Sequence, residues 1–214
     1  MRLLFVFLCC ISLSVTAQIN DTPVKLLHYA LDSFAMGQVH LKSGVVSNQR
    51  LNYNLLTKEM IFDYKGTYLA LAHPEEVDTV IIANRVFVPV DKGFYEVLIG
   101  GAYPLLVEYT CKVKGQGSQT GYGGNSNTTA ATPLKSLLNG NGAYKLRLPD
   151  EFELITGKGY YLYKNGKYNK INGAQQFVKL FPEKKEEIKQ WIESRHTSFS
   201  KQQDIIALVQ NLQP

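Results

Sequence analysis

The strongest constraint on the fold is an alternation of apolar and polar residues that recurs from Gly37 to about Ile171. Residues 105–113, with the sequence LLVEYTCKV, give the clearest example, because every odd-numbered position is apolar and polar side chains occupy positions 108, 110 and 112. Neighbouring residues of a β-strand point to opposite faces, so this pattern is typical of an antiparallel strand with one buried face. The pattern places Cys111 on the apolar face, where a free cysteine packs as a small hydrophobic residue.

Turn residues divide the alternating region into short segments at close spacing. Asn165-Gly166 is the clearest turn, since both residues tolerate the positive φ angles of a two-residue hairpin. The predicted strands are residues 51–55, 60–64, 67–71, 77–82, 86–90, 94–99, 105–113, 160–163 and 168–171. Such a series predicts an antiparallel sheet folded into a sandwich, a roll or a partial barrel. Helices do not alternate with the strands as they would around a parallel sheet.

The apolar pattern changes to a helical period near the C-terminus. Asn172 and Ser200 each precede a glutamine by three residues, which is the spacing of residues that cap helix N-termini, and Pro182 suits a first helical turn. Apolar residues three and four apart follow these starts. We therefore expect two or three short helices over residues 172–214 that cover one face or end of the sheet, in an α+β fold that is mainly β. Residues 22–35 fit either a strand or a short helix.

The first residues have the order of a secretory signal peptide. A single basic residue, Arg2, precedes an apolar run over residues 3–11, and small residues around Ala17 fit the site that a signal peptidase reads. The apolar run is shorter than the roughly 20 residues that span a membrane. We expect a signal peptide over residues 1–17 and one β-rich domain over residues 18–214. Its expected location is the periplasm or the outer membrane surface, without a transmembrane span.

Charge and cysteine content narrow the class further. The formal net charge is +5 at pH 7, and outside the C-terminal region the basic residues form no cluster. This distribution does not favour a nucleic-acid partner. Signal cleavage would leave Cys111 as the only cysteine, so an apolar core rather than an internal disulfide must stabilise the fold.

The sequence contains no recognisable catalytic or metal-binding motif. The four histidines lack the spacing of metal ligands, and no cofactor is expected. The carboxylates of Asp63, Asp78, Glu96 and Glu108 occupy turns or polar strand positions, where we expect solvated surface charge. A hydrolase acting on glycans or peptidoglycan would draw on these acids if two of them faced each other across the sheet.

Tyrosines are the side chains best suited to contact a ligand or a partner. Tyr160, Tyr161, Tyr163 and Tyr168 surround the predicted hairpin turn. Each offers an aromatic ring and a hydroxyl group, which together can hold a sugar or a peptide. The alternative interpretation is cross-strand pairing of the rings, which would stabilise the hairpin without binding anything.

Residues 114–133, KGQGSQTGYGGNSNTTAATP, form the longest irregular connection predicted in the β-rich region. They lack the lysine of a phosphate-binding P-loop, and they do not open a helix as a dinucleotide-binding loop does. Tyr122 is the bulky aromatic residue of this stretch and a further candidate contact. We interpret the stretch as a surface loop that is either mobile or part of a site.

Several segments together carry a resemblance to a family of proteins. They are GQV at 37–39, LNYNLLTKEM at 51–60, PEEVD at 74–78, FYEVL at 94–98 and GYGG at 121–124. In these segments the chain resembles a group of exported β-rich proteins of Bacteroidota bacteria that have no assigned activity. The resemblance implies an envelope location, and it carries over no catalytic residue.

The leading hypothesis is an exported, non-enzymatic envelope protein that binds a partner protein or an envelope component such as a glycan. The first alternative is the hydrolase described above. The second is a carrier of a lipid or another apolar ligand, in which inward residues such as Val107 and Tyr109 would line a cavity.

Overall fold

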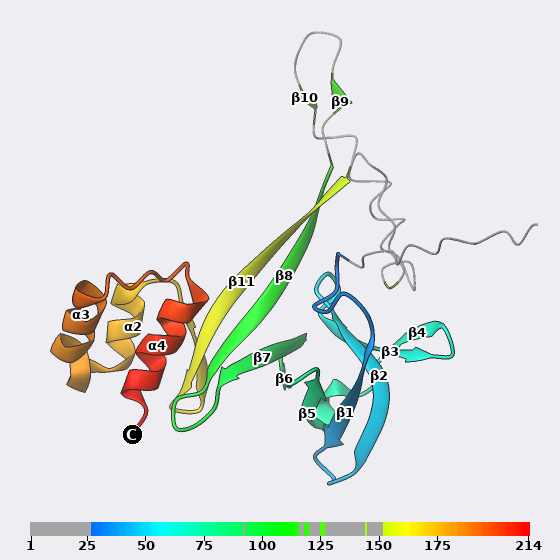
Figure 1. Cartoon of the computed structure of the whole chain (residues 1–214), viewed down its shortest axis with the longest axis horizontal. Coiled ribbons are helices and arrows are strands. Elements are labelled where there is room, and N and C mark those ends of the chain that lie inside the picture. The colour runs from blue at the N-terminus through cyan, green and yellow to red at the C-terminus, as the bar shows by residue number, and fades with distance from the viewer. Residues whose placement is uncertain (1–26, 92, 116–117, 120–124, 127–143, 145–151) are drawn as a thin grey trace, which may run out of the picture.

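The computed structural model describes residues 27–91, 93–115, 118–119, 125–126, 144 and 152–214. The signal peptide and Tyr122 lie outside these residues and stay predictions. Ten strands form one open antiparallel sheet in the order β12-β11-β8-β7-β6-β5-β1-β2-β3-β4 (Figure 1). Three short α-helices follow the sheet within residues 172–214. The predicted fold class, mainly β with an antiparallel sheet and short C-terminal helices, is confirmed.

The elements have the following bounds. The strands of the large sheet are β1 (Ala35–Leu41), β2 (Val46–Asn54), β3 (Glu59–Tyr64), β4 (Thr67–Ala70), β5 (Val77–Ile82), β6 (Arg85–Val90), β7 (Gly93–Ile99), β8 (Leu105–Gly115), β11 (Phe152–Lys164) and β12 (Lys167–Ile171). A separate two-stranded sheet pairs β9 (Ser118–Gln119) with β10 (Asn125–Ser126). The helices are η1 (Pro74–Glu76), α2 (Ala174–Leu180), η3 (Pro182–Lys184), α3 (Lys185–Ser194) and α4 (Gln202–Leu212).

The local turn chemistry acts as predicted. Asn165 and Gly166 adopt φ angles of 54° and 73°, and the flanking residues Lys164 and Lys167 pair across the β11–β12 hairpin. Between β5 and β6 the chain turns at Ala83-Asn84, again with positive φ at both positions. Two consecutive left-handed residues match the twist of a tight hairpin, which explains both turns.

Strand order departs from chain order at one place. β5 pairs with β1 rather than with β4, so β1 lies between β2 and β5 and is hydrogen-bonded on both edges. The chain returns from β4 to β5 through η1, which opens at Pro74. This crossover joins the β1–β4 meander to the strands β5–β8.

A first hydrophobic core joins one end of the sheet to the three helices. Glu96, Val107, Tyr160 and Ile171 pair in register across neighbouring strands, so their side chains lie on one face of the sheet. We call this the helix-side face. α4 contacts β7 and α2 contacts β12, and Figure 1 shows the helices beside the lower ends of β8 and β11. The core consists of Leu105, Val107, Tyr160, Leu162, Ile171, Phe177, Phe181, Ile188, Ile205, Leu208, Val209 and Leu212.

A second hydrophobic core forms where the sheet curls. β3 contacts β7 although four strands, β6, β5, β1 and β2, separate them in the sheet order. The enclosed side chains are Val39, Leu51, Tyr53, Leu55, Met60, Val77, Val80, Ile82, Phe87, Phe94 and Cys111. Cys111 is therefore a core residue, as predicted, and burial raises the pKa of its thiol. Tyr109 packs against both cores.

The start of the helices and the first described residues differ from the sequence predictions. The N-caps of α2 and α4 are Gly173 and Lys201, and neither makes a side-chain capping hydrogen bond. Asn172 and Ser200 are thus not caps, because packing of the apolar stripes rather than capping sets where the helices begin. Residues 27–34 form turns and one isolated bridge, Tyr29 to Asn54, and neither a strand nor a helix.

Candidate functional site

A cleft of about 860 Å³ opens between the two cores on the helix-side face. One wall comes from the N-terminal segment, residues 27–30, with Leu55. The other wall includes Phe199 and Ser200, which precede α4. Strands β8 and β11 run beneath both, so the cleft crosses the long ribbon that joins the two halves of the molecule.

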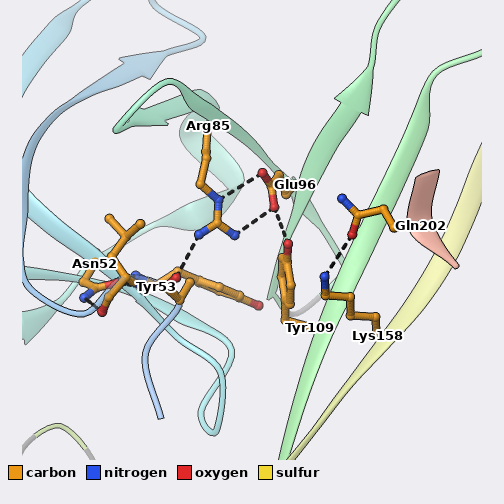
Figure 2. Close-up of polar contacts among 9 residues, drawn as sticks. Asn52, Tyr53, Arg85, Glu96, Tyr109, Lys158 and Gln202 are labelled. Carbon is orange, nitrogen blue, oxygen red and sulfur yellow. Dashed lines mark hydrogen bonds and ion pairs between the residues drawn. The ribbon is translucent and has the colours of Figure 1, made fainter. Parts of the chain in front are cut away.

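The floor of the cleft is built around Tyr109. Its ring lies 5.4 Å from the guanidinium carbon of Arg85 and 5.7 Å from Nζ of Lys158, measured to the ring centroid. Its hydroxyl group donates a hydrogen bond of 2.5 Å to Oε2 of Glu96, as Figure 2 shows. Burial and then the neighbouring Glu96 carboxylate raise the pKa of Tyr109, so the hydroxyl keeps its proton at neutral pH.

Arg85 and Glu96 form a buried ion pair behind Tyr109. Nε and Nη2 of Arg85 donate to the two carboxylate oxygens of Glu96 at 3.0 and 2.8 Å (Figure 2). Their side chains are only 22% and 10% exposed. Burial opposes the charge on Arg85, but the hydrogen bonds to Glu96 and its charge outweigh burial and raise the pKa of the guanidinium. The guanidinium of Arg85 therefore keeps its charge, and two of its N–H groups are engaged by the Glu96 carboxylate.

The same network fixes the N-terminal wall of the cleft. Nη1 of Arg85 donates to the carbonyl oxygen of Ala30 at 2.9 Å. Asn52, fully buried in β2, accepts from the amide of Leu31 at 3.1 Å and donates to its carbonyl oxygen at 2.8 Å. Sequence reasoning missed Asn52, because it occupies a polar position of the alternating segment 51–55, where solvent exposure is expected. These bonds hold residues 30–31 against the sheet without secondary structure.

Lys158 connects the cleft floor to the helices. It pairs with Tyr109 across the β8–β11 ladder, and its Nζ donates to Oε1 of Gln202 in α4 at 2.9 Å (Figure 2). The side chain is exposed, and two hydroxyl residues, Thr156 and Ser200, line the cleft nearby. The cleft thus combines a solvated ammonium group and hydroxyls with aromatic rings.

The four candidate acids lie in different surroundings. Asp78 is exposed, as predicted, whereas Asp63 accepts the Gly66 amide at 2.8 Å and its side chain is 15% exposed. For Glu96 and Glu108 the prediction of solvated charge is wrong. Glu108 accepts from Nζ of Lys58 at 2.5 Å and from the hydroxyl of Tyr161 at 2.8 Å.

The sheet separates the buried Glu96 from the partly buried Glu108. Glu96 faces the helix side with Val107, so Glu108, the next residue of β8, points to the opposite face. Burial raises the pKa of Glu108, but hydrogen bonds from Lys58 and Tyr161 outweigh it and the net shift is downward. Of the four acids only Glu108 borders the cleft, and its carboxylate is already engaged.

The hairpin tyrosines divide between the two faces of the sheet. Tyr160 is buried in the first core and lines the cleft. Tyr161 lies on the opposite face, where its ring packs 4.9 Å from that of Tyr95. Tyr163 and Tyr168 pair directly across the hairpin with ring centroids 4.9 Å apart, which is the cross-strand pairing of the alternative interpretation. Their contact with a ligand stays a prediction, as does that of Tyr122.

The two residues expected to line the cavity of an apolar carrier also lie in different surroundings. Val107 is fully buried against the helices, and Tyr109 faces the open cleft. These two side chains therefore do not line one enclosed cavity.

Comparison of the chain with family models, curated proteins and solved structures finds no match. Within the described residues, no group of three or more histidine, cysteine, aspartate or glutamate side chains is placed to hold a metal ion. In the same part of the chain no helix has both the length and the apolar character needed to cross a membrane.

Proposed function

We propose that the chain is an exported, non-enzymatic protein of the bacterial envelope that binds a glycan in the cleft between its two cores. Export rests on the signal-like residues 1–17 and on the resemblance to exported proteins of Bacteroidota. The choice of a glycan rests on the side chains that line the cleft.

The observation that carries the proposal is the mixture of aromatic and hydroxyl groups along the cleft. Tyr109, Tyr160 and Phe199 contribute rings, and Thr156 and Ser200 contribute hydroxyls between them. A sugar ring has an apolar face of C–H groups and a rim of hydroxyls, so it matches both kinds of group at once. Lys158 adds an exposed donor for a hydroxyl or a carboxylate of the glycan.

The placement of the buried acids supports binding rather than hydrolysis. A glycosidase needs two carboxyl groups roughly 5–10 Å apart on either side of one bond. Glu96 and Glu108 point to opposite faces of the sheet, and each is held by a cation and a tyrosine hydroxyl. Neither is available as a proton donor to a ligand in the cleft.

Removal of cleft side chains tests the proposal. Lys158→Ala removes the exposed donor, and Thr156→Trp fills part of the cleft. We expect each to weaken binding to soluble glycan fragments by about tenfold or more. Lys158→Ala loses roughly one charge-assisted hydrogen bond, and Thr156→Trp excludes part of the ligand. Isothermal titration calorimetry with fragments of peptidoglycan and of acidic polysaccharides measures the change.

Lys112→Ala is the matched control, because Lys112 is exposed on the same two-stranded ribbon but points to the opposite face. It should bind as the unaltered protein does. The proposal is contradicted if the unaltered protein binds no glycan. It is also contradicted if both cleft variants bind glycans as tightly as the unaltered protein. Glycan cleavage by the unaltered protein that is lost in Glu108→Gln would replace it with the hydrolase alternative.

A further inference from the structure

A second pocket lies on the opposite face of the sheet, away from the cleft and the helices. Its volume is about 380 Å³. Among its lining residues, we call the apolar Val88 and Leu106 the floor, the tyrosines Tyr163 and Tyr168 the wall, and the exposed charges Lys42 and Asp78 the rim. The strands bring these residues together from β5, β6, β8 and the β11–β12 hairpin, with Lys42 just after β1.

The two tyrosines present their rings to solvent in a fixed arrangement. Tyr163 is 37% and Tyr168 41% exposed, and the rings pack at an interplanar angle of 51°. Behind them the buried ring of Tyr95 meets Tyr168 edge-on at 6.3 Å. The Tyr95 ring limits rotation of the Tyr168 side chain. A ligand that binds there therefore pays little entropy to order the tyrosines. Burial raises the pKa of Tyr168, which keeps its hydroxyl a donor at neutral pH.

The rest of the pocket combines an apolar floor with one charge of each sign. Leu106 belongs to the small core of Val90, Tyr95 and Leu106 on this face. Nζ of Lys42 is held by a 2.8 Å hydrogen bond to the carbonyl oxygen of Glu75. Asp78 is exposed, and its carboxylate accepts a local hydrogen bond from the hydroxyl of Thr79. Lys42 and Asp78 therefore supply donors and acceptors around an apolar surface.

We infer that this pocket binds a single sugar unit, as a second glycan site on the face opposite the cleft. An aliphatic ligand would fit the floor but would remove water from Asp78 and Lys42 without replacing their hydrogen bonds. A small anion would meet the Asp78 carboxylate. A sugar ring satisfies both parts, since its C–H face packs on tyrosine while its hydroxyls bond to the rim.

The size of the pocket limits how much of a glycan it can take. Pockets for small molecules range from about 300 to 1,000 Å³, so 380 Å³ suits one ring rather than a chain. The ligand class rests on the proposed function, whereas the location does not. The two sites lie on opposite faces, and a long or branched glycan could occupy both at once, which would raise its overall affinity without new contacts.

Binding of soluble monosaccharides tests the inference. A panel of methyl glycosides, neutral and N-acetylated, is titrated into the protein without residues 1–17, and the heat of binding is measured by calorimetry. Tyr168→Ala should weaken binding by about tenfold, the amount expected for one lost aromatic stacking contact. Asp78→Asn, which changes only an exposed rim group, should weaken it without affecting the fold. Tyr64→Ala is the control, because Tyr64 is an exposed strand tyrosine outside the pocket.

The outcomes separate this inference from the proposed function. Loss of monosaccharide binding in Tyr168→Ala and Asp78→Asn, but not in Tyr64→Ala, supports the second site whatever the cleft variants do. Polysaccharide binding that falls with Lys158→Ala yet is unchanged by Tyr168→Ala and Asp78→Asn overturns the second site and leaves the cleft. No affinity for any glycoside in the panel overturns it as well.

Discussion

At the scale of single residues, the main surprise is that two glutamates of this sheet are shielded from solvent, Glu96 fully and Glu108 in part. Glu96 and Glu108 both occupy polar positions of alternating strands, where solvent exposure is the usual state. Each is instead shielded, and each has one cation and one tyrosine hydroxyl as partners. Pairing makes burial tolerable because desolvation of an unpaired carboxylate would cost several kcal/mol.

The Arg85–Glu96 pair gives a test of this burial. Arg85→Leu leaves the Glu96 carboxylate shielded and without its cation, so we expect the free energy of unfolding to fall by about 3 kcal/mol. In the double variant Arg85→Leu/Glu96→Leu, the free energy of unfolding should fall by less than the sum of the losses in the two single variants. Urea denaturation followed by circular dichroism measures both.

Arg50→Leu serves as the comparison, since the Arg50 side chain is 57% exposed and 3.9 Å from Asp63. An exposed pair of this kind contributes under about 1 kcal/mol. If Arg85→Leu were no more destabilising than Arg50→Leu, the ion pair would not be holding the cleft together.

At the scale of elements, β1 packs closely against both of its neighbours. Its neighbours β2 and β5 bond to both edges, and Gly37 lies where β1 pairs with Gln49 and Ile82. A Cβ atom on Gly37 would come within 2.5 Å of the Ile81 carbonyl oxygen and 3.1 Å of a Leu51 methyl group. Glycine is therefore required at this position by space and not by a left-handed backbone.

Gly37→Ala tests the close packing of β1. Because the nearest atom is main chain and cannot rotate away, we expect a loss of about 1–3 kcal/mol in unfolding free energy from overpacking. Gly100→Ala is the matched control, with no atom within 4 Å of the added methyl group. Equal midpoints of thermal unfolding for the two variants would show that β1 can shift to make room.

At the scale of the whole molecule, one sheet serves two cores. β7 and β8 contribute side chains to both, and Tyr109 packs against each of them. The polar network of Arg85, Glu96 and Lys158 fills the region between the cores, beside the cleft. Because the same strands run through both halves, we expect the halves to unfold together.

Leu208→Ala tests this coupling from the helical end. Leu208 is fully buried in α4, and its truncation should cost about 2–5 kcal/mol. Trp191 is the single tryptophan and packs on the helical core, so its fluorescence reports that half, whereas far-ultraviolet circular dichroism reports the helices and the sheet together. Both signals should shift to the same lower midpoint.

Gln210→Ala, an exposed change in the same helix, should leave both midpoints nearly unchanged. Separation of the fluorescence transition from the dichroism transition in Leu208→Ala would mean that the helical half unfolds by itself.

The sequence by itself determined the local elements of this protein. Alternation with period two located β3 to β8 and β12, and the positive φ angles that Asn165-Gly166 tolerates fixed one hairpin and its register. Outside the predicted segments lie β1, the first half of β2 and residues 152–159 of β11. The change to a helical period near residue 172 predicted the C-terminal helices. These features depend on residues close together in the chain, so their signals are readable without the fold.

Only the tertiary structure decided which residues meet and which charges are buried. The apolar run of β7 indicates a strand covered on both faces, but it does not tell which cation and which hydroxyl meet Glu96. The return of β5 to β1 and the curl that brings β3 to β7 depend on packing between residues far apart in the chain. They place Tyr109 and Lys158 in the lining of one cleft, with Arg85 in contact with the Tyr109 ring. Burial of a charge depends on what lies across the sheet, which is a property of the assembled core and not of any one strand.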